Sequence, residues 1–336
     1  MKHPATLDDF LTDESRMFRA DPKGVKTVFL PENYKELSCI LRDANVSGEL
    51  VTVAGSHTGL NGGSVPMDGG VVVGVEGLLN VTLARGFKSF TTHHQLHGLM
   101  SYAINEDETE AIFPAGASQL AVEAILNSHG LWHPPNPTEK LALMGSIVAN
   151  HSSGGRSFGF GTIRDYITRL GVVFPNGGFK LFSRGDITSN EFDRFNFSAG
   201  SQDYNFRRPT YEIPNLKTSA GLYTRPGMDF LELLTGSEGI LGVFTEVGFR
   251  VEKKRPYKSS LLFFEKEDDA FSFVDSMKQF RLDGEEYRND PDSQDLGILT
   301  LEFFDNNSLR LTIKVHVMIM EPWNRDIDVY FMCIFC

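Results

Sequence analysis

Two glycine-rich stretches, residues 54–63 and 144–156, constrain this chain more than any other feature of its sequence. Glycine leaves the backbone N–H uncovered and adopts positive φ readily, so consecutive N–H groups can turn inward and form a nest for an anion. For a single cluster of this kind, turn geometry in a surface loop is the plainer interpretation. Two clusters with serine, threonine and asparagine between the glycines favour a ligand, and they predict a cradle for the diphosphate of a nucleotide cofactor.

The common nucleotide-binding motifs do not describe these stretches. The first one follows a strand-like run, but its spacing differs from the G-x-G-x-x-G of the doubly wound dinucleotide fold. The sequence also contains no G-x-x-x-x-G-K-[ST], so a P-loop is unsupported. A less common type of nucleotide cradle is therefore expected.

Composition narrows the class of protein. A chain of 336 residues with 41% hydrophobic and 23% charged residues can bury a substantial core in about two domains. A net charge of −12 disfavours nucleic acid, because contacts to phosphates require clustered lysine and arginine. No apolar window is long enough for a membrane span, and the N-terminus lacks a secretory signal. Cysteines occur only at Cys39, Cys333 and Cys336, which suggests no disulfide framework, so we expect a cytoplasmic protein.

The periodicity of apolar residues predicts alternating small units. A helix is expected from about Tyr34 to a stop at Gly48, followed by strands at residues 50–54 and 70–75. Ser118 should cap a second helix that ends at Gly130, with Leu120, Ala121, Ala124 and Ile125 on its apolar face.

The second half of this region has an antiparallel character. Asn176-Gly177 is a strong hairpin-turn signal between the strand-like residues 166–174 and 179–182. Residues 243–251 alternate between apolar and other side chains as a strand should.

Three ordered segments resemble the FAD-binding segments of the vanillyl-alcohol oxidase and p-cresol methylhydroxylase (PCMH-type) flavoproteins. The first segment is residues 51–66, the second is 134–137 continued by 145–156 and 160–166, and the third is 234–243. The sequences of the three segments are most similar to those of the D-lactate dehydrogenase and glycolate oxidase D-subunit branch of that family.

The resemblance implies an α+β fold: a PCMH-type FAD-binding domain with a small parallel subdomain, a larger antiparallel subdomain, and FAD between them. We expect an N-terminal extension at residues 1–24, the FAD-binding domain at 25–253, and a substrate (cap) domain at 254–336 that opens with the β-α-β unit of a ferredoxin-like fold. In the family the cap carries a paired-histidine motif that binds a metal and acts on the substrate hydroxyl. That motif has no match here, His316 stands alone, and residues 312–336 resemble no part of the family. A truncated or frame-shifted cap domain is therefore expected.

The resemblance also implies cofactor contacts from all three segments. The N–H groups of the first segment and the Thr58 side chain would face the diphosphate, and donors from the second would face the flavin ring, where negative charge accumulates on reduction. Glu238 is expected to be buried with a donor partner, since an unpaired buried carboxylate is costly. The predicted FAD-binding residues are Gly55, Ser56, His57, Thr58, Gly59, Asn61, Gly62, Pro135, Asn136, Gly145, Ser146, Asn150, Ser153, Gly154, Arg164, Glu238, Gly239, Ile240 and Gly242.

Several histidines invite other interpretations. Some relatives attach FAD through a histidine that corresponds to Thr58, so His57 is expected to be a noncovalent neighbour of the cofactor. His93 and His97 have the spacing of a zinc-protease helix, but position 94 lacks the required glutamate, and an exposed polar patch is the plainer interpretation. His133 either lines the flavin pocket or packs in a proline turn. No metal site is predicted.

No catalytic base is assigned from the sequence. Arg164 and Asp165 could form an acid–base pair, but a surface or strand-edge salt bridge is the plainer interpretation. Lys217, Tyr223 and Arg225 fall where the family faces its substrate, but a solvated loop residue is the plainer interpretation of each.

The resemblance implies an FAD-dependent oxidoreductase that takes hydride from a small 2-hydroxy acid, such as D-lactate or glycolate, and passes the electrons to an unidentified acceptor. The alternative is an FAD-binding module without turnover, because the cap domain is incomplete. A third option is a reductase of the cell-wall precursor type, which would need NADPH to reduce the flavin. The close similarity of the three segments to the hydroxy acid branch disfavours it.

Overall fold

The structure, a computed structural model, describes residues 6–82, 90–95, 100–214, 216, 218, 220–254, 257, 259–278, 298–305, 308 and 330–335. The chain forms two compact units, each of which is described by itself. The larger unit comprises Met1–His133, Glu139–Ser152 and Ile163–Lys254. The smaller unit comprises Pro134–Thr138, Ser153–Thr162 and Arg255–Cys336.

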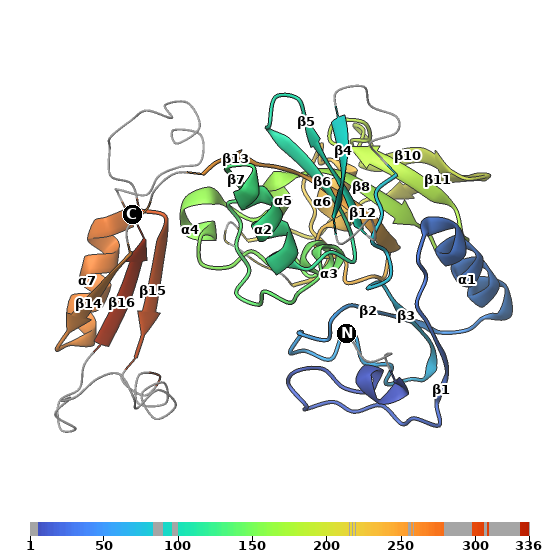
Figure 1. Cartoon of the computed structure of the whole chain (residues 1–336), viewed down its shortest axis with the longest axis horizontal. Helices are drawn as coiled ribbons and strands as arrows, with labels where there is room; N and C mark the ends of the chain where they lie inside the picture. The colour runs from blue at the N-terminus through green and yellow to red at the C-terminus, as the bar shows by residue number, and fades with distance from the viewer. Residues whose placement is uncertain are drawn as a thin grey trace. The chain divides into compact units, whose positions relative to one another are not determined.

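A three-stranded parallel sheet forms the first part of the larger unit. Its strands β1 (Val25–Phe29), β2 (Val51–Ala54) and β3 (Gly70–Gly74) lie in the order β1-β3-β2 (Figure 1). Helix α1 (Tyr34–Ser47) connects β1 to β2, and it begins where the Asn33 side chain accepts from the N–H groups of Lys35 and Glu36. It ends at Gly48, which has φ +69°. The predicted helix and its glycine stop are confirmed.

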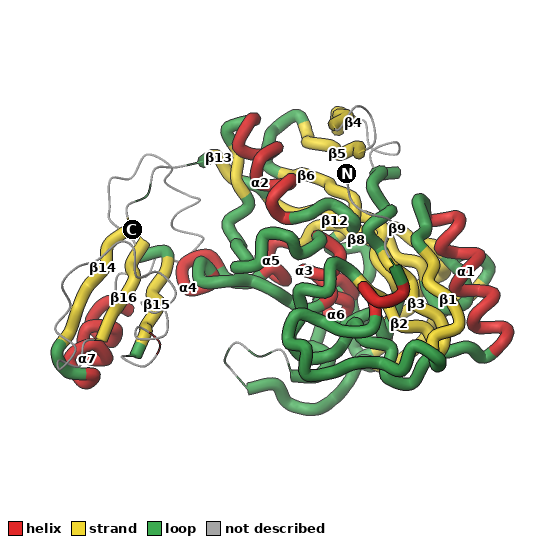
Figure 2. The backbone as a smooth tube through the Cα atoms, turned by 60° about the horizontal axis from the view of Figure 1, so that its bottom comes forward, coloured by secondary structure: helices red, strands yellow, loops and turns green. Residues whose placement is uncertain are grey.

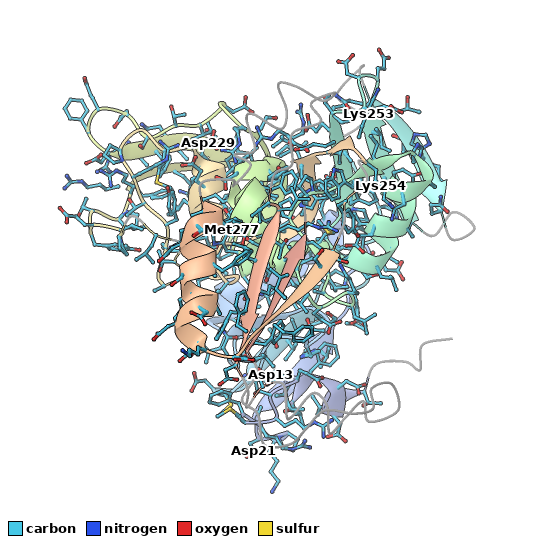
Figure 3. The ribbon with its side chains drawn as sticks, turned by 90° about the vertical axis from the view of Figure 1, so that its left-hand side faces the viewer. Asp13, Asp21, Asp229, Lys253, Lys254 and Met277 are labelled. Carbon is cyan, nitrogen blue, oxygen red and sulfur yellow. The ribbon has the colours of Figure 1, made fainter. Side chains whose placement is uncertain are left out.

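The N-terminal segment packs on this sheet. After the 3-10 turn η1 (Leu7–Phe10), the buried residues Phe10, Leu11 and Ala20 share a hydrophobic cluster with Val25 and Ala54. Figure 3 labels Asp13 and Asp21 in this segment. Residues 6–20, which the sequence assigns to an extension, thus supply part of the core of the small sheet.

A six-stranded sheet forms the second part of the larger unit, with every neighbouring pair of strands antiparallel. The order of its strands is β4 (Phe90–Gln95), β5 (Met100–Asn105), β6 (Glu110–Pro114), β12 (Val243–Arg250), β8 (Ile167–Val173), β9 (Phe179–Ser183). Residues 243–249 of β12 are all buried, because this central strand is covered on both faces. The alternation in residues 243–251 therefore predicts the strand correctly but not its burial.

The hairpin between β8 and β9 forms as predicted, with Gly177 at φ +81° and the Phe174 N–H donating to the carbonyl oxygen of Gly178. Two further pairs are antiparallel. Strands β10 (Arg194–Ala199) and β11 (Gln202–Arg207) form one pair, and β7 (Leu131–Trp132) and β13 (Glu252–Lys253) form the other.

The remaining helices of the larger unit are short. They are α2 (Gln119–Ser128), α3 (Met144–Ala149), α5 (Ile163–Tyr166) and α6 (Phe230–Leu234). Ser118 caps α2 as predicted, its hydroxyl oxygen accepting from the N–H of Ala121. The predicted apolar face is wrong in part: Leu120 is 54% exposed, while Val122 and Leu126 are buried. The apolar residues of α2 fit two adjacent faces, and packing selects one of them.

Helix α1 joins the two sheets into one unit. Its buried Leu37 and Leu41 share a cluster with Val73 of β3, Val173 of β8 and Val243 of β12. Figure 2 shows α1 beside strands of both sheets. The predicted combination of a small parallel part and a larger antiparallel part is confirmed, and the cluster around α1 holds the ends of β2 and β12 together.

The smaller unit contains a three-stranded sheet, ordered β14 (Ser259–Phe264), β16 (Tyr330–Phe335), β15 (Thr300–Phe304), together with α7 (Glu267–Met277) and α4 (Ser157–Phe160). Because β16 is antiparallel to both neighbours, β14 and β15 run parallel on either side of it. This is the split β-α-β order of ferredoxin-like folds, as predicted. Figure 3 shows α7 along this sheet, with Met277 at its end, and Met277 packs in the unit's hydrophobic cluster.

Some predictions fall outside the described residues. These concern His97, Lys217, the boundary at Arg255-Pro256, His316 and most of residues 312–336. Within the ranges given above, no helix combines the length and the apolar character that crossing a membrane would need.

Candidate functional site

One cavity in the larger unit brings the three predicted segments together. It has an empty volume of about 750 Å³, counted with the space open to solvent. Of the predicted FAD-binding residues, those that line it are Gly55, Ser56, His57, Thr58, Gly59, Asn61, Gly145, Ser146, Asn150, Glu238, Gly239 and Gly242. Three segments that are distant from one another in the sequence therefore share one cavity wall.

Close approach of the backbone explains why a glycine follows β2. A Cβ atom at Gly55 would lie 2.1 Å from Ser146 Oγ and 3.3 Å from Ser146 Cβ. A larger residue would displace the Ser146 hydroxyl and crowd Ser146 Cβ, so Gly55 lets the first segment lie directly against the second.

Backbone hydrogen bonds join the second segment to the third. The N–H of Gly236 donates to the carbonyl oxygen of Val148 over 2.9 Å, and the N–H of Glu238 donates to that of Ala149 over 2.9 Å. Both acceptors lie in the last turn of α3, where carbonyl groups lack partners within the helix. The turn at residues 236–240, which we call the third turn, is thereby fixed to α3.

The first loop, residues 55–61, differs because its donors remain unused. Within the described part of the chain, the N–H groups of residues 56–61 donate to no acceptor. The next one, that of Gly62, donates to Asp13 Oδ2 over 2.7 Å. Two buried side-chain atoms in the same loop, Ser56 Oγ and His57 Nε2, also have no partner among the described residues. A run of unused donors at a cavity suits an anion such as a diphosphate.

His57 is held in an unusual conformation beside this loop. Its φ is +57°, and its ring meets the Phe10 ring edge-on at 4.9 Å between centroids. Burial lowers the pKa of His57, against the opposing charges of Asp9 and Asp13. The imidazole is therefore neutral near pH 7. With Nδ1 facing Ser64 Oγ at 3.5 Å, Nε2 is the nitrogen left for a ligand.

Three predicted residues of the first and third segments differ from expectation. Gly62 and Ile240 do not line the cavity, and Ile240 is 69% exposed. Glu238 lines the cavity, but its side chain is exposed and makes no ion pair within the described residues. The expectation of a buried carboxylate with a donor partner is wrong, because the Glu238 side chain is exposed.

Arg164 lies on α5 and contacts the third segment instead of lining the cavity. It donates to the carbonyl oxygens of Glu232 and Thr235, and its guanidinium lies 4.1 Å from the centroid of the Tyr223 ring. A salt bridge between Arg164 and Asp165 is not among the ion pairs of the described residues.

Four other predicted residues, Pro135, Asn136, Ser153 and Gly154, belong to the smaller unit. Three of them contact one another there. The N–H of Asn136 donates to the carbonyl oxygen of Ser153 over 3.0 Å, and a Cβ atom at Gly154 would lie 1.9 Å from the Asn136 carbonyl oxygen.

The alternative candidates have structural roles. His133 packs 4.3 Å from the Phe249 ring, and His93 stacks on Tyr102 at 5.0 Å between centroids. Arg225 binds the buried carboxylate of Glu232 through two nitrogens, at 2.9 and 2.7 Å. Across the described ranges, no group of three or more His, Cys, Asp or Glu side chains is placed to hold a metal ion.

Two features of the site escape sequence reasoning. Ser64, inside the first segment, and Phe244, directly after the third, line the cavity beyond the predicted set. Asp13 supports the first loop through the N–H of Gly62, from 49 positions away. No local pattern marks such a long-range contact.

Comparison with known proteins agrees with this geometry. A family described as "FAD binding domain" matches residues 92–181. The D-lactate dehydrogenase of Archaeoglobus fulgidus is 27% identical over 224 residues, which cover 67% of this chain and 38% of that protein. The glycolate oxidase subunit GlcD of Bacillus subtilis is 25% identical over 244 residues, covering 72% of this chain and 40% of the relative. The chain therefore spans less than half the length of these relatives.

A solved structure shares the fold. An alkyldihydroxyacetonephosphate synthase aligns with 92% of this chain and 48% of its own, with a TM-score of 0.58 and 14% identity. Together with the matched family, this confirms the predicted fold class and FAD as the cofactor. The chain is thus similar to D-lactate dehydrogenases and glycolate oxidase D-subunits, and its residues 92–181 match the FAD binding domain family.

Proposed function

We propose that the cavity of the larger unit holds FAD, with the diphosphate on the first loop, and that the protein oxidises a small 2-hydroxy acid of the D-lactate or glycolate type. The observation that supports this most is the convergence of all three predicted segments on one cavity. The substrate class is supported by the relatives named D-lactate dehydrogenase and glycolate oxidase.

Different residues of the cavity would hold different parts of the cofactor. The free N–H groups of residues 56–61, together with Ser56 Oγ and His57 Nε2, would hold the diphosphate. Asn150 uses its side-chain nitrogen to donate to the carbonyl oxygen of Ser146 over 3.0 Å, which orients it at the cavity wall. Bound FAD would supply an acceptor for the hydride of the hydroxy acid.

The test is to purify the chain, record its visible spectrum, and titrate the apo form with FAD while following flavin fluorescence. We expect a flavin spectrum or saturable quenching. Absence of both would reject the proposal. The bound flavin is then mixed anaerobically with D-lactate, glycolate and D-2-hydroxyglutarate, and bleaching of its visible absorbance by any of these would support hydroxy acid oxidation.

The second candidate is an FAD-binding module that does not turn over alone. It is motivated by the sequence, which contains no match to the paired-histidine motif that the family resemblance implies for the cap domain. Bound flavin that stays oxidised with every hydroxy acid would favour this candidate over the enzyme.

A further inference from the structure

Arg164 joins three parts of the larger unit through one guanidinium group. Its Nε donates to the carbonyl oxygen of Glu232 over 3.1 Å and its Nη2 to that of Thr235 over 2.9 Å. Its Nη1 lies 3.3 Å from His151 Nε2, and because arginine can only donate, the imidazole accepts there. Each nitrogen therefore serves a different partner.

The two carbonyl groups lie at the end of α6. Thr235 is the C-cap of this five-residue helix, and the last carbonyl groups of a helix lack partners within it. The negative end of the helix dipole also stabilises a cation placed there. Arg164 thus closes α6 at the residue that precedes the third turn.

The third turn follows directly and lies against the same side chain. Gly236 has φ +87°, and a Cβ atom added to it would lie 3.3 Å from both Arg164 Nη2 and His151 Cβ. The N–H groups of Gly236 and Glu238 then bind the last turn of α3. Arg164 therefore contacts the turn without lining the cavity, whereas Glu238 and Gly239 of the same turn line it.

The contacts of Arg164 are specific to a guanidinium. No carboxylate forms an ion pair with it among the described residues, since the carboxylate of neighbouring Glu232 binds Arg184 and Arg225. Instead the Tyr223 ring lies under the planar group. A lysine ammonium is a point charge on a flexible stem and reproduces neither the three donor directions nor the stacking.

We propose that Arg164 is a positioning residue for the cofactor site: it fixes the third turn against α3 without touching the cofactor. This inference rests on the proposed FAD site in the cavity. It reassigns a residue that the sequence places among the cofactor contacts to a role behind the wall of the cavity.

The experiment compares Arg164→Lys with Arg169→Lys in the full chain. Arg169 is a matched control: its Nε donates to Glu110 Oε1 over 2.7 Å and its guanidinium lies 5.4 Å from the Phe90 ring centroid, away from the cavity. Amide hydrogen exchange of the apo proteins gives a readout without cofactor. Arg164→Lys should speed exchange of the Gly236 and Glu238 N–H groups, whereas Arg169→Lys should leave them unchanged.

The same proteins are titrated with FAD. We expect Arg164→Lys to raise the Kd by about tenfold or more, as for the loss of charge-assisted hydrogen bonds, with Arg169→Lys close to wild type. If wild type binds FAD and Arg164→Lys matches it in affinity and exchange, the positioning role is overturned while the FAD site stands. If wild type binds no FAD, the proposed function and this inference fall together.

A second variant guards against misfolding of the first. His151→Phe keeps a ring but removes the acceptor of Nη1, leaving the two carbonyl contacts of Arg164 in place. It should give a smaller change of the same kind in exchange and affinity. Wild-type exchange at Gly236 and Glu238 in this variant, with wild-type affinity, would contradict the proposal.

Discussion

The first loop and the third turn share a glycine-rich composition and a cavity, but their amide groups have opposite roles. In the third turn the N–H groups of Gly236, Glu238 and Ile240 all donate to carbonyl oxygens of the chain. In the first loop the N–H groups of residues 56–61 have no acceptor within the described residues. Glycine thus shapes a scaffold in one place and exposes a binding surface in the other, and only the partners of the amides tell the two apart.

The largest expected effect comes from separating the first loop from its support. In Gly55→Val the new side chain meets Ser146 at a position where even a Cβ atom would lie 2.1 Å from Oγ. We expect FAD affinity to fall by about 100-fold or more and the free energy of unfolding by about 1–3 kcal/mol. Fluorescence titration and urea unfolding would measure the two changes.

Gly248→Val is the control for overpacking. A Cβ atom at Gly248 would lie 2.8 Å from Arg169 Cβ, far from the cavity lining. It should reduce stability to a similar extent and leave the FAD affinity of the folded protein unchanged. Equal losses of affinity in both variants would show that the first loop has no special role.

A smaller loss of FAD affinity is expected from changes in the third turn. Gly236→Ala combines positive φ with contacts of 3.3 Å to Arg164 and His151, so the third turn should shift and FAD affinity should fall by about tenfold. Gly185→Ala has a similar φ, +92°, but open space around its Cβ. It should cost about 1 kcal/mol of stability without weakening FAD. Unchanged affinity in Gly236→Ala would mean that the third turn is not part of the cofactor site.

Two serine hydroxyls, those of Ser56 and Ser118, test the same difference between a ligand-binding group and a structural group. Ser56 Oγ is buried without a partner among the described residues, whereas Ser118 Oγ caps α2. Ser56→Ala should leave the apo protein as stable as wild type or slightly more so, and weaken FAD by about fivefold. Ser118→Ala should cost about 1 kcal/mol of stability and leave FAD binding intact. Thermal unfolding of the apo forms and FAD titration would test this pair, and a stability loss in Ser56→Ala would contradict an unused hydroxyl.

Local signals in the sequence predict much of this fold. Asn33 and Gly48 mark the ends of α1, and Asn176-Gly177 marks the hairpin between β8 and β9, because capping and turn geometry depend on a few neighbouring residues. The three segments of the cavity could also be identified, since each keeps its glycines for close approach or unusual φ.

The remaining features depend on partners distant in sequence. The carbonyl oxygens of Val148 and Ala149 accept hydrogen bonds from N–H groups of the third turn and not from those of the first loop. This difference leaves the amides of the first loop free. The support of Gly62 by Asp13 and the exposure of Glu238 likewise follow from packing. Composition and motif spacing do not reveal contacts between residues that are distant in sequence. For this reason the sequence assigns Arg164 to the cofactor contacts and residues 6–20 to an extension.

The smallest expected effect is a pH dependence that originates in the first loop. Burial lowers the pKa of His57 in the folded protein, so between the folded and unfolded pKa values the unfolded chain binds more protons. Stability of the apo protein should therefore be fully present above about pH 6.5 and fall as the pH drops through the folded pKa. Asparagine tolerates the φ of +57°, so His57→Asn should reduce the slope.

The bound anion should reduce the same slope, because a diphosphate near Nε2 favours the imidazolium and raises the pKa of His57. Urea unfolding at several pH values, with and without saturating FAD, would measure this. His93, whose pKa burial also lowers, contributes with the same sign, so the difference between wild type and His57→Asn isolates the first loop. An equal slope in both proteins would contradict a neutral, partly buried His57, whereas a slope that FAD leaves unchanged would place the diphosphate away from this histidine.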